Sequence, residues 1–145
     1  IPETVDIRGT ALSPRHVVTQ SVSQTEIFCY IPIDEARQLK EGMRVRVSPD
    51  WAPREQYGYI IGMVKSVGDT PVHIDNLRDE LGEYFEFLYL PSGNLIEVIV
   101  EMETNPDGSL RWSKSQSTAV NLTVGTICNL TVITAERRPI ELMFR

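Results

Sequence analysis

Apolar and polar residues alternate along several short segments of the chain, which is the pattern of β-strands with one buried face. In MRVRVSP, Met43, Val45 and Val47 fall on one side, and the two arginines between them fall on the other. LIEVIVEME separates an apolar side from a side of glutamates in the same way. Further strands are expected in VDIRGTAL, TEIFCYIPI, YIIGMVKSVG and TVGTICNLTVIT, with a last short strand in IELMFR. Gly9 and Gly62 indicate bulges or bends within their strands, and the glycines of YGYIIGMVKSVG are also expected to permit close packing.

Between residues 73 and 90 the apolar residues recur every three and four positions instead. This spacing predicts one or two short amphipathic helices, broken near Gly82. Their apolar positions are Ile74, Leu77, Leu81, Phe85 and Leu88. A separate helical turn is expected in IDEARQLKEG, whose acidic residues come first and whose Gly42 ends it. DWAPREQYG, PSGN, TNPDGS and ERRP are expected to form turns or loops, and residues 111–120 to be irregular.

These elements predict a mostly β fold with one or two short helical insertions, built as a barrel or a sandwich. The chain of 145 residues has the usual size of one domain, so residues 1–145 are expected to form a single domain. Hydrophobic residues make up 41% and charged residues 23%, which argues against a disordered or membrane-embedded chain. The net charge of −6 argues against a nucleic-acid partner, because nucleic-acid-binding domains usually carry a basic face.

The chain contains no apolar run of about 18 residues and no pattern of a signal peptide. It begins at Ile1 rather than at methionine. We therefore expect a mature or trimmed form from which a leader or a membrane anchor has been removed.

The two cysteines, Cys29 and Cys128, lie far apart and form no CxxC motif, so their spacing indicates neither a zinc site nor a thioredoxin-like site. Two interpretations remain open. Both cysteines are small buried strand residues, or they form a disulfide between strands in an oxidising compartment. Sequons at Asn121 and Asn129 are attributed to the frequency of threonine in strands.

Residues that could support catalysis are few. His16 and His73 are the only histidines, and neither lies in a pattern of serine, cysteine and aspartate that resembles a catalytic triad. Glu101 and Glu103 share the outward side of a strand and could bind a cation, although a solvated strand face is the favoured interpretation. No glycine-rich loop links a strand to a helix. The sequence predicts no catalytic residue, no metal site and no cofactor. An enzyme, the less favoured hypothesis, would gather His16 or His73 with two carboxylates in one cleft.

Two aromatic segments predict surfaces for a partner, because aromatic residues and arginine are enriched at interfaces. One is the loop from Trp51 to Tyr59 with the strand that emerges from it, a surface that charge reversal at Arg54 or Arg46 would test. The other is the patch Tyr84–Leu90 in the segment GEYFEFLYLPSG, part of which is expected to lie in the core. The candidate interface residues are Trp51, Arg54, Tyr57, Tyr59, Tyr84, Phe87 and Tyr89.

The segment GMRVRVSPDWAPREQYGYIIGMVKSVGDTP resembles the part of hemolysin-D-type membrane fusion proteins that follows their coiled-coil hairpin. The segments LIEVIVEME and GTICNLTVITAERRPIELMF resemble the later parts of that family in the same order. Matching positions in the last segment are Gly125, Val132, Arg137 and Pro139. The opening IPxxV, the segment GMxVxVSP and the pair Trp112-Ser113 are similar to the secretion proteins of NHLM-type bacteriocin export systems. The resemblance covers about residues 25–145 and, more weakly, residues 1–22.

The resemblance implies a β-barrel domain, with a possible membrane-proximal part, in a non-catalytic periplasmic adaptor. The implied partners are an inner-membrane ABC transporter that exports peptides or bacteriocins and further copies of the protein in a ring. The implied location is extracytoplasmic, with an anchor in the inner membrane that precedes Ile1. An alternative function is a free-standing β-barrel module that binds a ligand or a peptide.

One departure from the family is large. Its members insert a lipoyl-like domain and a helical hairpin before the strand TEIFCYIPI, whereas this chain has only TQSVSQTE, so the arm is absent at about residues 19–25. Contact with an outer-membrane channel would depend on that missing arm. So short a linker predicts that the strands on either side of it lie close together at one rim. In such a barrel, the strands of Cys29 and Cys128 could be neighbours.

Overall fold

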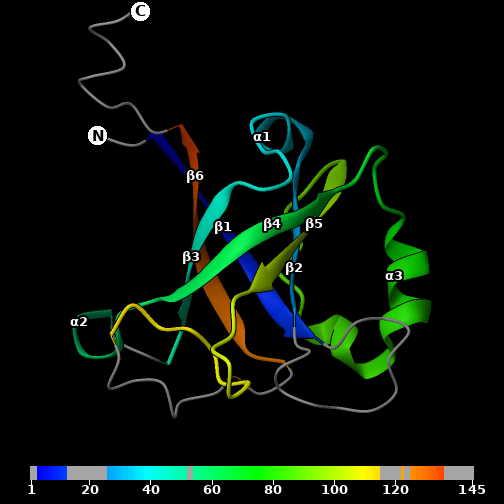
Figure 1. Ribbon diagram of the computed structural model, residues 1–145. Coiled ribbons are helices and arrows are strands. Elements are labelled where there is room, and N and C mark those ends of the chain that lie inside the picture. Colours follow the sequence, from blue (N-terminus) through cyan, green and yellow to red (C-terminus); the bar gives the residue numbers. More distant parts are fainter. Residues whose placement is uncertain (1–2, 13–25, 52–53, 115–121, 123–124, 136–145) are drawn as a thin grey trace, which may run out of the picture.

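The computed structural model describes residues 3–12, 26–51, 54–114, 122 and 125–135. Six antiparallel strands close into a barrel in the order β1-β2-β5-β4-β3-β6 (Figure 1). Their bounds are β1 Glu3–Leu12, β2 Glu26–Pro32, β3 Arg44–Pro49, β4 Ile60–Val67, β5 Leu95–Met102 and β6 Ile127–Ala135. The α-helices are α1 Ile33–Ala36, α2 Arg54–Tyr57 and α3 Ile74–Leu81, and the 3₁₀ helix η2 Gly82–Phe87 follows α3. The closed barrel confirms the mostly β prediction and excludes the sandwich.

The alternating residues of the strands fill the barrel interior. Val45 and Val47 of β3 are fully buried, as are Val98 and Val100 of β5, and all four belong to one apolar cluster. The inward and outward sides predicted for these two strands are therefore confirmed. The glutamates between the apolar residues of β5 point away from the interior, because successive side chains of a strand point to opposite faces.

The ten residues of β1 span the barrel from one end to the other, about 30 Å at the usual rise per residue. At one end, Glu3 is the register partner of Ala135, so the first and last strands meet there. At the other end, Leu12 is the partner of Glu26. Strands β1 and β2, which flank residues 13–25, thus lie side by side at one rim, as the short linker predicts. Helix α1 lies at the first end, and α2 lies at the second (Figure 1).

The insertion between β4 and β5 forms α3 and η2 and packs beside the barrel (Figure 1). Leu77 of α3 is buried in a second apolar cluster with Phe28 and Tyr30 of β2, on the outer side of that strand. Gly82 separates the two helices with a φ of 56°, which confirms the predicted break. Ile74 does not join the apolar face, because it is the first residue of α3 and is 43% exposed. The apolar contact begins one turn later, at Leu77.

The predicted bulges at Gly9 and Gly62 are wrong. Both glycines pair in regular register, and the irregularities lie between Glu3 and Thr4 in β1 and between Val64 and Ser66 in β4. The two glycines instead allow close packing. A Cβ atom on Gly9 would lie 2.5 Å from the Cys29 Sγ, and one on Gly62 would lie 2.9 Å from a backbone oxygen of β5.

Other predictions need smaller corrections. DWAPREQYG contains the four-residue helix α2 rather than only a loop, and α1 covers just the start of IDEARQLKEG. Trp112, expected in an irregular segment, forms a β-bridge with Ile60. TNPDGS forms the predicted turn, with Asn105 N donating to Ser109 O at 2.8 Å. Residues 115–120, the turn ERRP and the expected strand IELMFR lie outside the described residues.

Candidate functional site

The four candidate interface residues whose side chains the structure describes fall in three separate places. Trp51 and Tyr57 lie at the end of the barrel that carries α2, Tyr59 lies beside the outer face of β3, and Tyr89 lies against β1. Arg54 belongs to α2, and Tyr84 and Phe87 belong to η2, but their side chains are outside what the structure describes. The sequence therefore identified exposed aromatic residues without identifying one continuous surface.

Three aromatic rings gather at the α2 end of the barrel. Tyr57 meets Trp51 edge to face, with ring centroids 5.7 Å apart, and meets Trp112 in a tilted contact at 6.3 Å. Trp112 is buried in the barrel core, Tyr57 is half-buried against it, and Trp51 is 47% exposed. The cluster thus anchors one exposed tryptophan at the end where β1 and β2 are connected. Rigid aromatic side chains of this kind contribute strongly to interfaces.

A groove of about 390 Å³ lies on the outer face of β3 and β4. Arg44 and Arg46 contribute from β3, Met63 contributes from β4, and Arg111 comes from the segment after β5. The guanidinium of Arg46 lies over the ring of Tyr59, at 5.2 Å from its centroid. Tyr59 is thus the one predicted interface residue that the structure places in this groove.

Arg111 reaches the groove because the hairpin after β5 folds back along the start of β4. Its backbone N donates to Glu103 O at 2.9 Å, and its carbonyl accepts from Ile61 N at 2.9 Å. Its guanidinium also pairs with the Glu103 carboxylate at 3.0 Å. Glu103 therefore pairs with an arginine, whereas the sequence suggested that it could share a cation with Glu101.

Three guanidiniums and one carboxylate give the groove a formal charge of +2. Arginine presents its donors in a planar fork that matches carboxylate or phosphate groups. The groove can therefore bind an anionic group beside the apolar surface of Met63. Sequence reasoning missed this site because Arg44 and Arg46 have the pattern of an ordinary exposed strand face. Arg111 lies more than 60 positions away, in a segment expected to be irregular.

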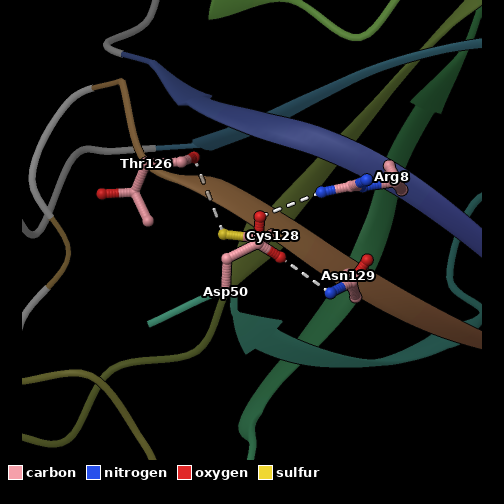
Figure 2. A network of polar contacts seen from close by, with 5 residues as sticks. All are labelled: Arg8, Asp50, Thr126, Cys128 and Asn129. Carbon is pink, nitrogen blue, oxygen red and sulfur yellow. Dashed lines mark hydrogen bonds and ion pairs between the residues drawn. The ribbon is translucent and has the colours of Figure 1, made fainter. Parts of the chain in front are cut away.

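A second polar network joins β1, β3 and β6 on the outside of the barrel (Figure 2). The carboxylate of Asp50, just after β3, pairs with Arg8 of β1 at 2.9 Å and accepts from Asn129 Nδ2 of β6 at 2.8 Å. The Arg8 guanidinium also lies over the Tyr89 ring, at 5.4 Å from its centroid. The Nε of Arg8 is buried without a hydrogen-bond partner. This network holds the exposed Tyr89 against β1, so the arrangement is mainly structural.

Both cysteines are free and buried in the structure, as the first interpretation predicts. Their strands are not neighbours, because β1 lies between β2 and β6. Burial raises the pKa of Cys128 to about 12, and the nearby charge of Asp50 adds to the effect. Burial also raises the pKa of Cys29, with a further contribution from Cys128. Thiols that keep their proton are poor nucleophiles and poor metal ligands.

In the part of the chain that the structure describes, one histidine shares a surface groove with carboxylates, which is the arrangement expected of an enzyme. His73 is exposed at the start of α3 and shares a surface groove with Asp69, Glu80 and Glu97. The Glu97 carboxylate accepts a hydrogen bond from the Tyr30 hydroxyl at 3.0 Å. No group of three or more potential metal ligands gathers among the described residues. His16 lies outside them.

None of the described helices is long and apolar enough to cross a membrane. A scan against models of known protein families finds no match to the chain, and a search of curated proteins finds no similar protein.

Proposed function

We propose that the protein is a non-catalytic periplasmic adaptor subunit of an ABC-transporter-linked system that secretes peptides or bacteriocins. One structural observation carries most of the proposal. The chain enters and leaves the barrel at one end, where Glu3 pairs with Ala135, and the β1–β2 connection lies at the opposite end, beside Leu12 and Glu26. The β1–β2 connection is the place where the hemolysin-D-type family carries its arm.

An adaptor with this geometry acts as a rigid spacer between two partners. The closed barrel pairs both edges of each described strand and holds its two ends apart by somewhat less than the length of β1, because barrel strands are tilted. An anchor that precedes Ile1 would hold the α1 end near the inner membrane and its ABC transporter. Any arm or outer-membrane channel would then lie beyond the α2 end. Further copies would surround the transporter in a ring. Positioning and contact are the whole mechanism, so no reacting group is needed.

Site-specific photo-crosslinking in cells that carry the native transport system tests this orientation. A probe at Asp34, which is exposed on α1, should crosslink to an ABC transporter. The matched probe at Asp107, which is exposed on the hairpin after β5 at the other end, should not. Deletion of the gene should also abolish export of the peptide. Recovery of no transporter from Asp34, with export unchanged in the deletion strain, would contradict the proposal.

The alternative, a free-standing module that binds a ligand or a peptide, is favoured by one observation. The arginine groove of about 390 Å³ is within the range of small-molecule sites, about 300–1,000 Å³. The barrel interior is filled by core side chains, so a ligand would bind on the outside. This alternative predicts that a monomer binds acidic ligands saturably and loses that binding in Arg44→Ala. It also predicts unchanged export in the deletion strain.

A further inference from the structure

Charge is segregated between two opposite sides of the barrel. The arginine groove on β3 and β4 carries a formal charge of +2. Residues 74–87, which form α3 and η2, contain five acidic residues and one arginine, a net charge of −4. The acidic residues are Asp75, Asp79, Glu80, Glu83 and Glu86. The insertion packs on β2, and in the closed order of six strands β2 lies across the barrel from β3.

The acidic side of the insertion is held in place by its apolar side. Leu77 is buried against the barrel, and Leu81 and Phe85 pack on the same cluster. Arg78 lies over the Phe85 ring at 5.0 Å and pairs with Asp75 at 3.5 Å. The Asp75 side chain is nevertheless 93% exposed, and Asp79, Glu83 and Glu86 are also exposed. The carboxylates therefore form a preorganised surface, which lowers the entropic cost of binding.

The groove presents the complementary chemistry. Arg44 is exposed, and Arg111 keeps more than half of its side chain exposed although it pairs with Glu103. A guanidinium has five donors, so the contact of Arg111 with Glu103 and the contact of Arg46 with the Tyr59 ring leave donors on these two arginines for a further carboxylate. Met63, 40% exposed, adds apolar surface beside them. The net charge of −6 repels any other anionic molecule, a second copy of the chain included. Association therefore requires that the local contacts between carboxylates and guanidiniums outweigh this repulsion.

We propose that the arginine groove of one copy receives the acidic face of α3–η2 from a second copy. Because the two surfaces differ and lie on opposite sides of the barrel, the contact is head to tail and builds a ring or a filament rather than a twofold dimer. Charge complementarity identifies a second copy as the occupant of the arginine groove, because every copy of the chain carries the acidic face of α3–η2. This contact rests on the self-association in the proposed function and specifies the two surfaces that would form it. It does not depend on the identity of the transporter.

A charge-swap experiment on the purified chain tests the inference. One variant carries Arg44→Glu and Arg46→Glu, and the other carries Asp79→Lys and Glu83→Lys. Sedimentation velocity measures association at about 0.01 M ionic strength, where the Debye length is about 30 Å, and again at about 1 M, where it is about 3 Å. The wild type should associate at low salt and dissociate at high salt. Each variant alone should associate at least about tenfold more weakly at low salt.

The decisive measurement is the equimolar mixture of the two variants. In the mixture, the unchanged groove of one variant meets the unchanged acidic face of the other variant, so dimers should form again. Matched controls make the same change in net charge at the α1 end: Arg37→Glu with Lys40→Glu, and Asp34→Lys with Glu41→Lys. All of these positions are exposed, and thermal unfolding verifies that each variant is folded. The controls should associate more strongly than the corresponding groove and insertion variants.

Three results would overturn the inference: a monomeric wild type at low salt, a mixture that fails to associate, or controls that lose association as completely as the test variants. None of these results bears on the crosslink from Asp34 to a transporter. Failure of this inference and failure of the adaptor proposal can therefore be distinguished.

Discussion

The two sides of the barrel use the same strand pattern but have different outer surfaces. On β2, the outward residues Phe28 and Tyr30 are buried beneath α3 and η2. On β3, the outward residues Arg44 and Arg46 line an open groove. The interiors of both sides are equally apolar, so the difference comes from what covers the outside. One side of this barrel is thus covered by helices, which adds buried apolar surface, and the other side stays polar and open to a partner.

The difference has an energetic consequence. Apolar area removed from water contributes about 25 cal/mol per Å², so the covered side should contribute far more to folding than the open side. The open side carries charged groups at partly exposed positions, each of which contributes little. Mutations on the two sides should therefore separate effects on stability from effects on association.

The largest effect is expected for Phe28→Ala on the covered side. Phe28 is almost fully buried between the barrel and the insertion, so its loss should lower the free energy of unfolding by about 3–5 kcal/mol. The matched change Met63→Ala on the open side should cost less than about 1 kcal/mol, because Met63 is partly exposed. Urea unfolding followed by circular dichroism measures both. Similar losses for the two variants would remove the contrast between the sides.

Gly9→Ala should have the next largest effect, a destabilisation of about 1–3 kcal/mol from overpacking. The new Cβ would meet the Cys29 Sγ at 2.5 Å, an Ile27 methyl at 2.7 Å and the Phe28 backbone oxygen at 3.0 Å. Gly62→Ala on β4 should cost less, because only one atom would lie within 3 Å of its Cβ. Differential scanning calorimetry of both variants, and of Gly9→Ala with Cys29→Ala, tests this packing. Full additivity in the double variant would show that the Sγ contact is unimportant.

The buried thiols should make stability fall at alkaline pH. Burial raises the pKa of Cys128 from 9.0 to about 12, so the unfolded chain releases this proton first as pH rises above about 9. The protonated Cys128 thiol makes its full contribution to the free energy of unfolding below pH 9.0. This contribution is lost progressively towards pH 12, by up to about 1.4 kcal/mol per pH unit. Urea midpoints for wild type and Cys128→Ala, measured across this range, should show a shallower decline in the variant. Parallel curves would contradict the role of this thiol.

The smallest effect is expected for Asp50→Asn, which removes the charge between Arg8 and Asn129. The Arg8 and Asp50 side chains are each more than two-fifths exposed, so solvent weakens their attraction and the loss should be about 0.2–1 kcal/mol. The loss should shrink at high ionic strength. Urea unfolding at two salt concentrations tests this, with Asp107→Asn as a control of equal charge change. A loss independent of salt would indicate a packing role for Asp50.

Much of the fold could be predicted because strand periodicity and turn chemistry are local. The faces of β3 and β5, the break at Gly82 and the closeness of β1 and β2 were all accessible from the sequence. For Gly62 the expected close packing was right and the expected bulge was wrong, because both features require glycine and only the neighbouring strands distinguish them. The close approach at Gly9 was not accessible for the same reason. Ile74 fitted the helical spacing but lies at the first position of α3, where the helix does not yet contact the barrel.

The candidate site was less predictable. Exposed aromatics such as Trp51 and Tyr89 were found by composition, but the groove required Arg111 to lie beside Arg44. That proximity depends on the hairpin after β5, which is held to β4 by backbone hydrogen bonds.

The sequence by itself determined which side chains face the barrel interior, since the alternation of a strand is fixed by its own backbone. Only the tertiary structure decided the order of the strands, the covering of β2 by the insertion and the separation of Cys29 from Cys128 by β1. These features depend on contacts between residues far apart in the chain, and no local pattern encodes which distant segments will meet. The segregation of acidic and basic surfaces onto opposite sides of the barrel arises at that same level.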